Sequence, residues 1–312
     1  MGKLTIALLS GGKSSEREVS LSSGNGVFDA LDKNKYDVIR YDPATDLGRL
    51  VADASTIDAA VIILHGPYGE DGTVQGLLDL LDIPYQGAGV LGSALSMNKL
   101  TAKRMYEMAG LPVPAYTWVE EGAPVRTARW IDRLGLPLVV KPVSCGSSIG
   151  MTIVREESAL ADAVALARQY DDTVLLEAYI DGVEITGGVL GNRSPEALPL
   201  IEIIPESGHE FFDYEAKYTA GVTREICPAR IDEALTYKAQ SYAVTAHEAL
   251  FCKGYSRTDM ILRGQEIFVL ETNTIPGMTP TSLYPQAARA AGYSFSQLMD
   301  RLIELSLEGR DR

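Results

Sequence analysis

Four polar side chains near the C-terminal end of the chain have types and spacing that suit phosphate and metal chemistry. Arg257 and Asp259 stand two residues apart, and so do Glu271 and Asn273. Residues two apart on a β-strand project from the same face, so each pair shares a face if its segment is a strand. Carboxylate and amide oxygens are the hard donors that magnesium prefers. The pattern therefore favours a site for Mg²⁺ ions that bridge nucleotide phosphates.

The alternative is a charged strand face exposed to water. The residues between the polar positions argue against it, because Met260, Ile261 and Leu262 in one segment and residues 268–270 in the other are apolar. An acidic residue within a buried strand needs a charged partner or a metal ion. Of the two interpretations, the metal site is favoured.

A second candidate is the five-residue loop Gly-Ser-Ser-Ile-Gly that begins at Gly146. Gly146 and Gly150 free the backbone to present N–H groups, and Ser147 and Ser148 add hydroxyl donors, so the loop could cradle a phosphate. Lys141 stands just before it and is a natural point-charge partner for phosphate. The loop by itself fits an ordinary hairpin turn beside a solvated lysine equally well.

A third candidate follows the acidic positions, at residues 274–283. This segment contains a Pro-Gly pair, and Ser282 stands where a helical pattern is expected to begin. The Pro-Gly loop frees backbone N–H groups, and a helix N-terminus is a ready site for a carboxylate. A plain capped helix would show the same pattern.

Three familiar motifs match only in part. Residues 12–14, Gly-Lys-Ser, resemble the end of a Walker A loop, but the position that needs its first glycine is Ala7. Residues 87–92 match G-x-G-x-x-G, yet no acidic residue follows about 20 positions later, so a glycine turn before a helix is the better interpretation. Residues 146–150 match G-x-S-x-G, but a strand pattern at 151–154 follows where a nucleophile elbow needs a helix.

The elements that must position these residues follow from hydrophobic patterning. Buried apolar runs alternate with helical patterns up to residue 95, which predicts a parallel α/β sheet. Short, glycine-punctuated strands predict a small α+β unit up to residue 182. A long polar and aromatic loop at 205–224 is of the kind that often forms a lid. We therefore predict three units, over residues 1–95, 96–182 and 183–312.

Within these units, short apolar runs predict strands and segments with helical periodicity predict helices. The expected strands cover residues 4–9, 36–41, 59–64, 138–141, 151–154, 173–177, 183–190, 200–204, 257–262 and 266–271. The expected helices cover residues 16–31, 73–81, 95–108, 157–168, 232–250, 285–291 and 296–307.

Composition limits the classes of function. The 312 residues are 46% hydrophobic and 22% charged, which is ordinary for a soluble globular protein. Lys+Arg 28 against Asp+Glu 42 gives a net charge of −14, which opposes binding to nucleic acid or anionic membrane, so we expect neither partner. Three scattered cysteines, the short N-terminal apolar run and the lack of a long apolar stretch predict a cytoplasmic location.

Taken in order, these segments and others resemble the ATP-grasp superfamily and, within it, the D-alanine–D-alanine ligase family. They read SGGKSSEREVS at 10–20, LHGPYGEDG at 64–72, SMNK at 96–99, KP at 141–142 with GSSIGM at 146–151, FDYEAKY at 212–218, and ETN at 271–273 through SL at 282–283. The set lies in family order and spans nearly the whole chain, so it is far more specific than any one motif.

The resemblance implies a three-unit ATP-grasp architecture of α/β and α+β type, with an N-terminal parallel α/β domain. It implies that ATP converts one D-alanine to an acyl phosphate and that the amine of a second D-alanine attacks it. The product would be D-alanyl-D-alanine for peptidoglycan precursor, with ADP and phosphate released, and a homodimer is expected. Two alternatives stay open: a ligase for D-alanyl-D-lactate or another dipeptide, and a catalytically idle ATP-binding regulator.

The resemblance also implies which residues bind the nucleotide and the metal ions. The residues implied for the phosphates of ATP are Lys99, Lys141, Gly146, Ser148 and Lys217, those for adenine are Glu177 and the backbone of Ile180, and that for ribose is Glu184. The residues implied for two magnesium ions, with manganese as a substitute, are Asp259, Glu271 and Asn273.

Further residues are implied for the amino-acid substrates and the chemical steps. Glu16 would hold the ammonium of the first D-alanine, and Ser147, Tyr218 and Glu16 would link the closed lid to the N-terminal unit. Ser282 and Leu283 would receive the carboxylate of the second D-alanine. Arg257 and the backbone N–H of Gly277 suit the oxyanion of the tetrahedral intermediate, and His65 is counted among the catalytic residues.

Overall fold

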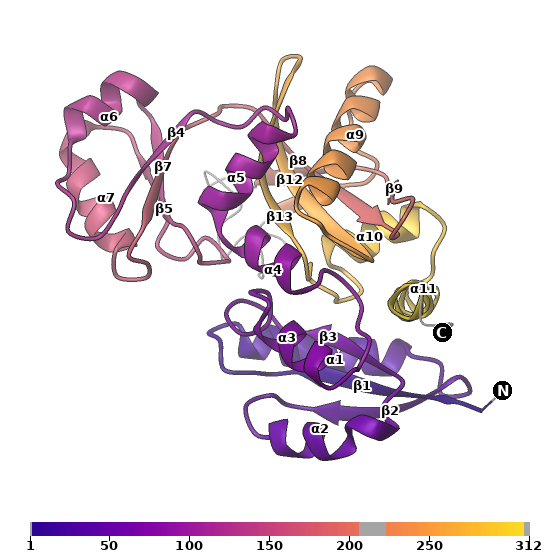
Figure 1. Ribbon diagram of the computed structural model, residues 1–312. Coiled ribbons are helices and arrows are strands. Elements are labelled where there is room, and N and C mark those ends of the chain that lie inside the picture. Colours follow the sequence, from indigo (N-terminus) through magenta and orange to yellow (C-terminus); the bar gives the residue numbers. More distant parts are fainter. Residues whose placement is uncertain (1, 206–222, 309–312) are drawn as a thin grey trace.

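The first part of the chain forms a parallel sheet of three strands (Figure 1). Strand β1 (Leu4–Ser10) lies in the middle and pairs in parallel with β2 (Tyr36–Tyr41) and β3 (Ala59–Ile63). All five residues of β3 are buried, as a strand covered on both faces requires. The parallel sheet predicted from the apolar runs is confirmed. The computed structural model describes residues 2–205 and 223–308.

Helices cover both faces of this sheet. Alternate side chains of β1 enter two different hydrophobic clusters, with Ile6 and Leu8 in one and Ala7 and Leu9 in the other. The first cluster contains residues of α1 (Arg17–Ala30) and of α11 (Phe295–Leu307), and the second contains residues of α2 (Leu47–Asp53) and α3 (Thr73–Leu80). A short 3₁₀ helix, η1 (Ala54–Thr56), follows α2.

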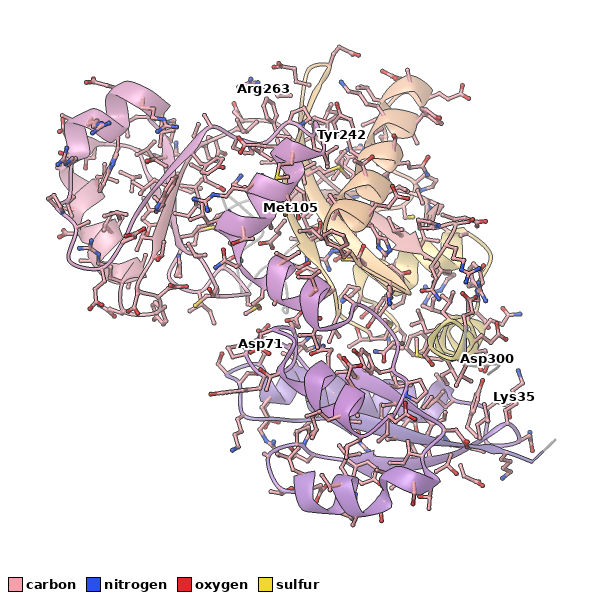
Figure 2. The ribbon with its side chains drawn as sticks, viewed as in Figure 1. Lys35, Asp71, Met105, Tyr242, Arg263 and Asp300 are labelled. Carbon is pink, nitrogen blue, oxygen red and sulfur yellow. The ribbon has the colours of Figure 1, made fainter. Side chains whose placement is uncertain are left out.

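The last helix of the chain therefore covers the first sheet. Figure 2 labels Lys35, beside β2, and Asp300 of α11, whose Nζ and Oδ2 atoms lie 2.6 Å apart. Leu298 and Leu302 of α11 are buried in the same cluster as β1. The N-terminal sheet thus depends on a helix almost 300 residues away along the chain.

The central part is a four-stranded antiparallel sheet in the order β4-β7-β5-β6. Its elements are β4 (Tyr116–Val119), α6 (Thr127–Leu134), β5 (Leu138–Pro142), β6 (Thr152–Val154), the 3₁₀ helix η2 (Glu157–Ala159), α7 (Leu160–Ala167) and β7 (Val174–Ala178). Strand β4 and helix α6 were not predicted. Strand β4 has only four residues and lies at an edge, and α6 buries only Trp130, so neither shows a clear periodicity.

The C-terminal part is built on a sheet in the order β11-β10-β8-β12-β13, with β9 paired to β8. Its elements are β8 (Val183–Leu190), β9 (Glu196–Ala197), β10 (Ile201–Pro205), β11 (Thr223–Ile226), α9 (Glu233–Ala249), β12 (Tyr255–Arg263), β13 (Glu266–Asn273) and α10 (Leu283–Ala290). In Figure 1, α9 and α5 (Lys99–Met108) lie beside this sheet. Met105 of α5 and Tyr242 of α9, labelled in Figure 2, pack against one hydrophobic cluster.

The predicted helix at 95–108 is two helices, α4 (Val90–Met97) and α5. Asn98 between them is extended, with φ −90° and ψ 98°, and its side chain accepts a hydrogen bond from the backbone N–H of Thr101. Asparagine is among the best N-cap residues, so it ends one helix and begins the next. The break places Lys99 at the first position of α5.

A β-bulge sets which residues of β13 face the core. Asp259 pairs with Glu271, but Met260 pairs with Val269, so Leu270 is the extra residue. In a regular strand, side chains two residues apart point to the same face, so Val269 would lie on the face of the sheet that carries Glu271. With the bulge, Val269 is fully buried and Leu270 is only half-buried on the side of the acidic residues.

Candidate active site

A cavity between the central and C-terminal sheets collects most of the residues predicted to bind nucleotide and metal. Its walls come from strands β5, β6 and β7 on one side and β8, β12 and β13 on the other. In Figure 1, β5 and β7 lie on one side of α5, and β8, β12 and β13 lie on the other. The predicted residues that line it are Lys99, Lys141, Gly146, Ser147, Ser148, Glu177, Ile180, Glu184, Asp259 and Glu271. Segments that are far apart in the sequence therefore meet in a single cavity.

Apolar side chains that the sequence analysis did not single out complete this cavity. Val139, Ile153, Ile261 and Leu270 line it and are half-buried. Val139 lies between Leu138 and Val140, which are fully buried in the core of the central sheet. The alternation along the strand was the available signal, since it turns every second apolar residue away from the core.

The glycine-serine loop adopts a backbone conformation that is rare for serine. Ser147 and Ser148 have φ values of 50° and 58°, and Gly150 has 71°. Gly146 lies outside this left-handed region. Two consecutive left-handed non-glycine residues carry strain, which tends to collect at ligand sites.

Lys99 links helix α5, the segment before the glycine-serine loop, and strand β13. Its Nζ atom donates to the carbonyl oxygen of Cys145 at 2.8 Å and lies 3.2 Å from Glu271 Oε2. Its backbone N–H bonds the carbonyl of Val143. The first residue of α5 is thus held between the loop and the acidic strand β13.

Lys141 is paired with Glu177 on the neighbouring strand. Lys141 Nζ lies 2.8 Å from Glu177 Oε2, and both residues are buried. Burial alone would lower the pKa of Lys141, but the negative charges of Glu177 and Glu271 raise it above its ordinary value. The other oxygen of Glu177 contacts Lys103, a buried residue that the sequence analysis missed. The signal in the sequence that could have identified Lys103 was its position on the buried face of a helical pattern.

The four polar residues of the hairpin lie together, as their spacing predicted. The register places Arg257 opposite Asn273 and Asp259 opposite Glu271. Arg257 Nε and Nη2 each donate to an Asp259 oxygen at 2.9 Å, and Asn273 Nδ2 donates to Asp259 Oδ2 at 3.1 Å. Asp259 is only 6% exposed, and Thr186 Oγ1 also donates to it, at 2.6 Å.

Glu16 and His65 form a second group beside the loop. Glu16 is 5% exposed, and its Oε1 atom accepts a hydrogen bond from Ser147 Oγ. His65 is 7% exposed, and its Nε2 atom has no hydrogen-bond partner among the described residues. Burial lowers the pKa of His65; Arg257 lowers it further, while Glu16 opposes the shift. A neutral, unsatisfied imidazole next to a carboxylate is suited to bind a small polar ligand.

Glu70 is a second acidic residue of this group that was not predicted individually. Its Oε2 atom accepts a hydrogen bond from the backbone N–H of Gly66 at 2.7 Å. Burial, reinforced by the charge of Glu16, raises the pKa of Glu70 to about 8. The residue lies within the 64–72 motif, but nothing in the local sequence distinguishes it from Asp71.

The segment before α10 has the helix start that the sequence predicted. Ser282 is the N-cap residue, and its hydroxyl contacts Thr279, with Oγ 2.7 Å from Thr279 Oγ1. Leu283 is 5% exposed and its side chain is in the core, so only its backbone can face a ligand. Gly277 lies close to Ser282, because a Cβ atom built on Gly277 would be only 3.1 Å from Ser282 Oγ. The loop is therefore packed against the start of the helix.

Two predicted site residues, Lys217 and Tyr218, lie outside the described residues, as does most of the predicted lid. Strand β11 begins just after that segment. Glu225 of β11 accepts a hydrogen bond from Gln286 of α10. The strand that follows the predicted lid is therefore linked to α10.

Two family models match the chain. The model described as D-ala D-ala ligase N-terminus matches residues 5–51 and 44–88, and the model described as D-ala D-ala ligase C-terminus matches residues 105–304. The chain belongs to the D-alanine–D-alanine ligase family. This confirms the resemblance and, with it, the ATP-grasp architecture with an N-terminal parallel α/β domain.

Individual family members are similar over their whole length. The D-alanine–D-alanine ligase of Syntrophobacter fumaroxidans is 64% identical over 306 residues, which cover 98% of each chain. That of Desulfotalea psychrophila is 53% identical, over 98% of this chain and 96% of the relative. The similarity thus extends well beyond the motifs.

Solved structures of the family share the fold. The Bacillus anthracis D-alanine–D-alanine ligase complexed with ATP has a TM-score of 0.85 at 34% identity, with 98% of each chain covered. The VanG D-Ala:D-Ser ligase of Enterococcus faecalis also has a TM-score of 0.85, at 35% identity over 97% of this chain and 99% of that one. Among residues 2–205 and 223–308, no helix is long and apolar enough to cross a membrane.

Proposed function

We propose that this ligase joins two D-alanines with ATP bound in the cavity between its central and C-terminal sheets. The observation that carries the proposal is the meeting of Lys99, Lys141 and the glycine-serine loop with Asp259 and Glu271 around one cavity. Cationic side chains and a backbone cradle suit the phosphates of ATP, and the opposing carboxylates suit a divalent metal. The half-buried apolar side chains of the cavity suit the adenine ring.

The donor set of the hairpin fits magnesium. Asp259 and Glu271 face each other, each already beside a cationic side chain, and Asn273 adds an amide. Within the described part of the chain, no three His, Cys, Asp or Glu side chains gather as a metal site. Asp259, Glu271 and Asn273 would therefore hold Mg²⁺ together with phosphate oxygens, as is usual beside nucleotides. The metal, when bound, would neutralise phosphate charge.

The first D-alanine would bind between Glu16 and His65. The Glu16 carboxylate would accept hydrogen bonds from the ammonium group, and Ser147 holds that carboxylate in place. The buried Nε2 atom of His65 would gain the partner that it lacks among the described residues. This orientation would present the D-alanine carboxylate to the γ-phosphate of ATP, with Lys217 proposed as a further phosphate contact.

The second D-alanine would bind at the start of α10. The first backbone N–H groups of a helix have no partner within the helix, so that of Leu283 suits a carboxylate. The Ser282 N–H already donates to the carbonyl oxygen of Thr279, so Ser282 would contact the carboxylate through its hydroxyl. Its amine would attack the acyl phosphate, and phosphate would leave. Arg257 and the Gly277 N–H would stabilise the oxyanion, which requires Arg257 to share its guanidinium with Asp259.

The decisive experiment measures products with ATP, Mg²⁺ and amino acids of both hands. ADP and inorganic phosphate are expected only when D-alanine is present, with D-alanyl-D-alanine formed in equal amount. AMP and pyrophosphate as products would refute γ-phosphoryl transfer to a carboxylate. ATP binding without any turnover would instead favour the idle regulator.

The choice of the second substrate needs its own measurement, because a D-Ala:D-Ser ligase shares the fold. With D-alanine, D-serine and D-lactate mixed in equal amounts, D-alanyl-D-alanine is expected as the main product at pH 7. The predicted lid contains Tyr218, whose hydroxyl would join Ser147 and Glu16 and so order the lid and the amine site. Tyr218→Phe is expected to lower activity or broaden acceptor choice. A predominance of ester or of D-alanyl-D-serine would overturn the assignment.

We also propose a cytoplasmic location and a homodimer. ATP is the phosphoryl donor of this reaction, and the cytoplasm is where the cell supplies it. Sedimentation of the purified chain at micromolar concentration is expected to give twice the mass of 33.7 kDa. A single 33.7 kDa species at all concentrations would refute the dimer.

A further inference from the structure

Lys103 is a wholly buried lysine next to the nucleotide cavity. It lies on α5, its exposed fraction is 0%, and it is not among the residues that line the cavity. Its Nζ atom lies 2.7 Å from Glu177 Oε1, while Lys141 Nζ lies 2.8 Å from Glu177 Oε2. One carboxylate therefore bridges two lysines, one facing the cavity and one behind it.

The fold alone gives no reason for a lysine at this position. Its neighbours on the buried face of α5, Ala102 and Tyr106, pack in the core with α9. A buried ammonium loses its hydration, and replacement of buried ion pairs by apolar residues is often neutral or stabilising. A methionine would fill similar volume at this helical position without that cost. The lysine therefore points to a role in the site rather than in folding.

The charges show what Lys103 changes. Glu177 and Lys141 alone would form a neutral pair, and both carboxylate oxygens would be available to Lys141. With Lys103 protonated the triad carries one net positive charge; burial lowers the pKa of Lys103, and the carboxylate of Glu177 opposes that shift. Since Lys103 occupies Oε1 and lies behind the cavity, the positive charge that remains is directed through Lys141 into the cavity, where phosphates are proposed to bind.

We propose that Lys103 is a positioning residue of the nucleotide site, which holds Glu177 from behind and so keeps the charge of Lys141 available to the phosphates of ATP. Lys103 acts through Glu177 and does not touch the nucleotide. The inference rests on the proposed function, because it takes the cavity to be the ATP site.

The test compares ADP binding, measured by isothermal titration calorimetry with Mg²⁺, in the full-length chain and its variants. Lys103→Met is expected to weaken ADP binding and raise the KM for ATP about tenfold, while the KM for D-alanine stays within about twofold. Lys103→Arg keeps the charge and should recover most of the affinity. Arg104→Met is the matched control, since Arg104 is the exposed next residue on α5, and should bind ADP like the unmodified chain.

A double-mutant cycle separates positioning from a general structural effect. With Glu177→Gln in place, Lys103 has no carboxylate to hold, so adding Lys103→Met should change ADP affinity less than about threefold. Equal weakening in both backgrounds would overturn the proposal, as would unchanged affinity in Lys103→Met alone. If Lys103→Met fails to fold, Lys103→Gln alone and with Glu177→Gln gives the same comparison. An unmodified chain that does not bind ADP would refute the proposed function instead.

Discussion

Removal of the Ser147 hydroxyl is expected to weaken the first D-alanine site. Ser147 Oγ donates to Oε1 of Glu16, a carboxylate that is only 5% exposed. A hydrogen bond to a buried charged group contributes roughly 1.5–3 kcal/mol. If that bond orients Glu16 for the substrate ammonium, Ser147→Ala should raise the KM for the first D-alanine roughly ten- to hundredfold.

Initial rates over a wide range of D-alanine concentration, at saturating ATP, separate the KM values of the two D-alanine sites. The backbone is the main confounding factor, because Ser147 has a φ of 50°. Ser147→Gly removes the same hydroxyl and also relieves the backbone, so it should match Ser147→Ala in its effect on the first site. Ser148→Ala, at φ 58°, is expected to raise the KM for ATP instead.

Two results would refute this reasoning. If Ser147→Ala leaves the KM for the first D-alanine within twofold of the unmodified enzyme, the hydroxyl does not orient Glu16 for substrate. If Ser147→Gly restores normal kinetics, the effect of alanine came from the left-handed backbone and not from the lost hydrogen bond.

Three further outcomes are expected. Glu271→Gln removes a charged ligand and should cut kcat at least about a hundredfold at limiting Mg²⁺, and near-normal activity there would remove Glu271 from the metal site. Gly150→Ala would place a Cβ atom 2.7 Å from Tyr170 and should raise the KM for ATP about tenfold, whereas Gly122→Ala, at a similar φ with open space around it, should leave it unchanged. The folded chain keeps a proton on Glu70 up to about pH 8, while the unfolded chain releases it near pH 4.5, so the free energy of unfolding should fall as pH rises through this window. Melting temperatures measured from pH 5 to 8.5 should therefore fall less steeply in Glu70→Gln than in the unmodified chain. Equal slopes would contradict the raised pKa of Glu70.

The sequence was most informative where structure is local. The apolar run of β1 and the helical pattern of α1 appear within one or two residues of their predicted bounds. The hairpin of β12 and β13 has only a short turn, at residues 264–265, so the pairing of Asp259 with Glu271 follows from a nearby reversal of the chain. The residue types within these elements then indicated two functions, the binding of a metal ion by oxygen ligands and the binding of phosphate.

Local pattern also had limits inside single elements. The helical periodicity continues through Asn98, but its side chain caps α5, and the predicted helix is two. The bulge at Leu270 could not be read from alternation, because it depends on which residues the opposite strand offers to the core. In both places a side-chain contact, rather than periodicity, decides the backbone.

By itself, the sequence determined the order of the elements, the parallel N-terminal sheet and the set of residues with chemical potential. Only the tertiary structure decided which of them meet. Lys99 contacts Glu271 of another predicted unit, and α11 covers the first sheet of the chain. Periodicity shows that a residue has a buried face, but the partner across that face is set by packing between distant segments, where burial forces each charge to find an opposite one.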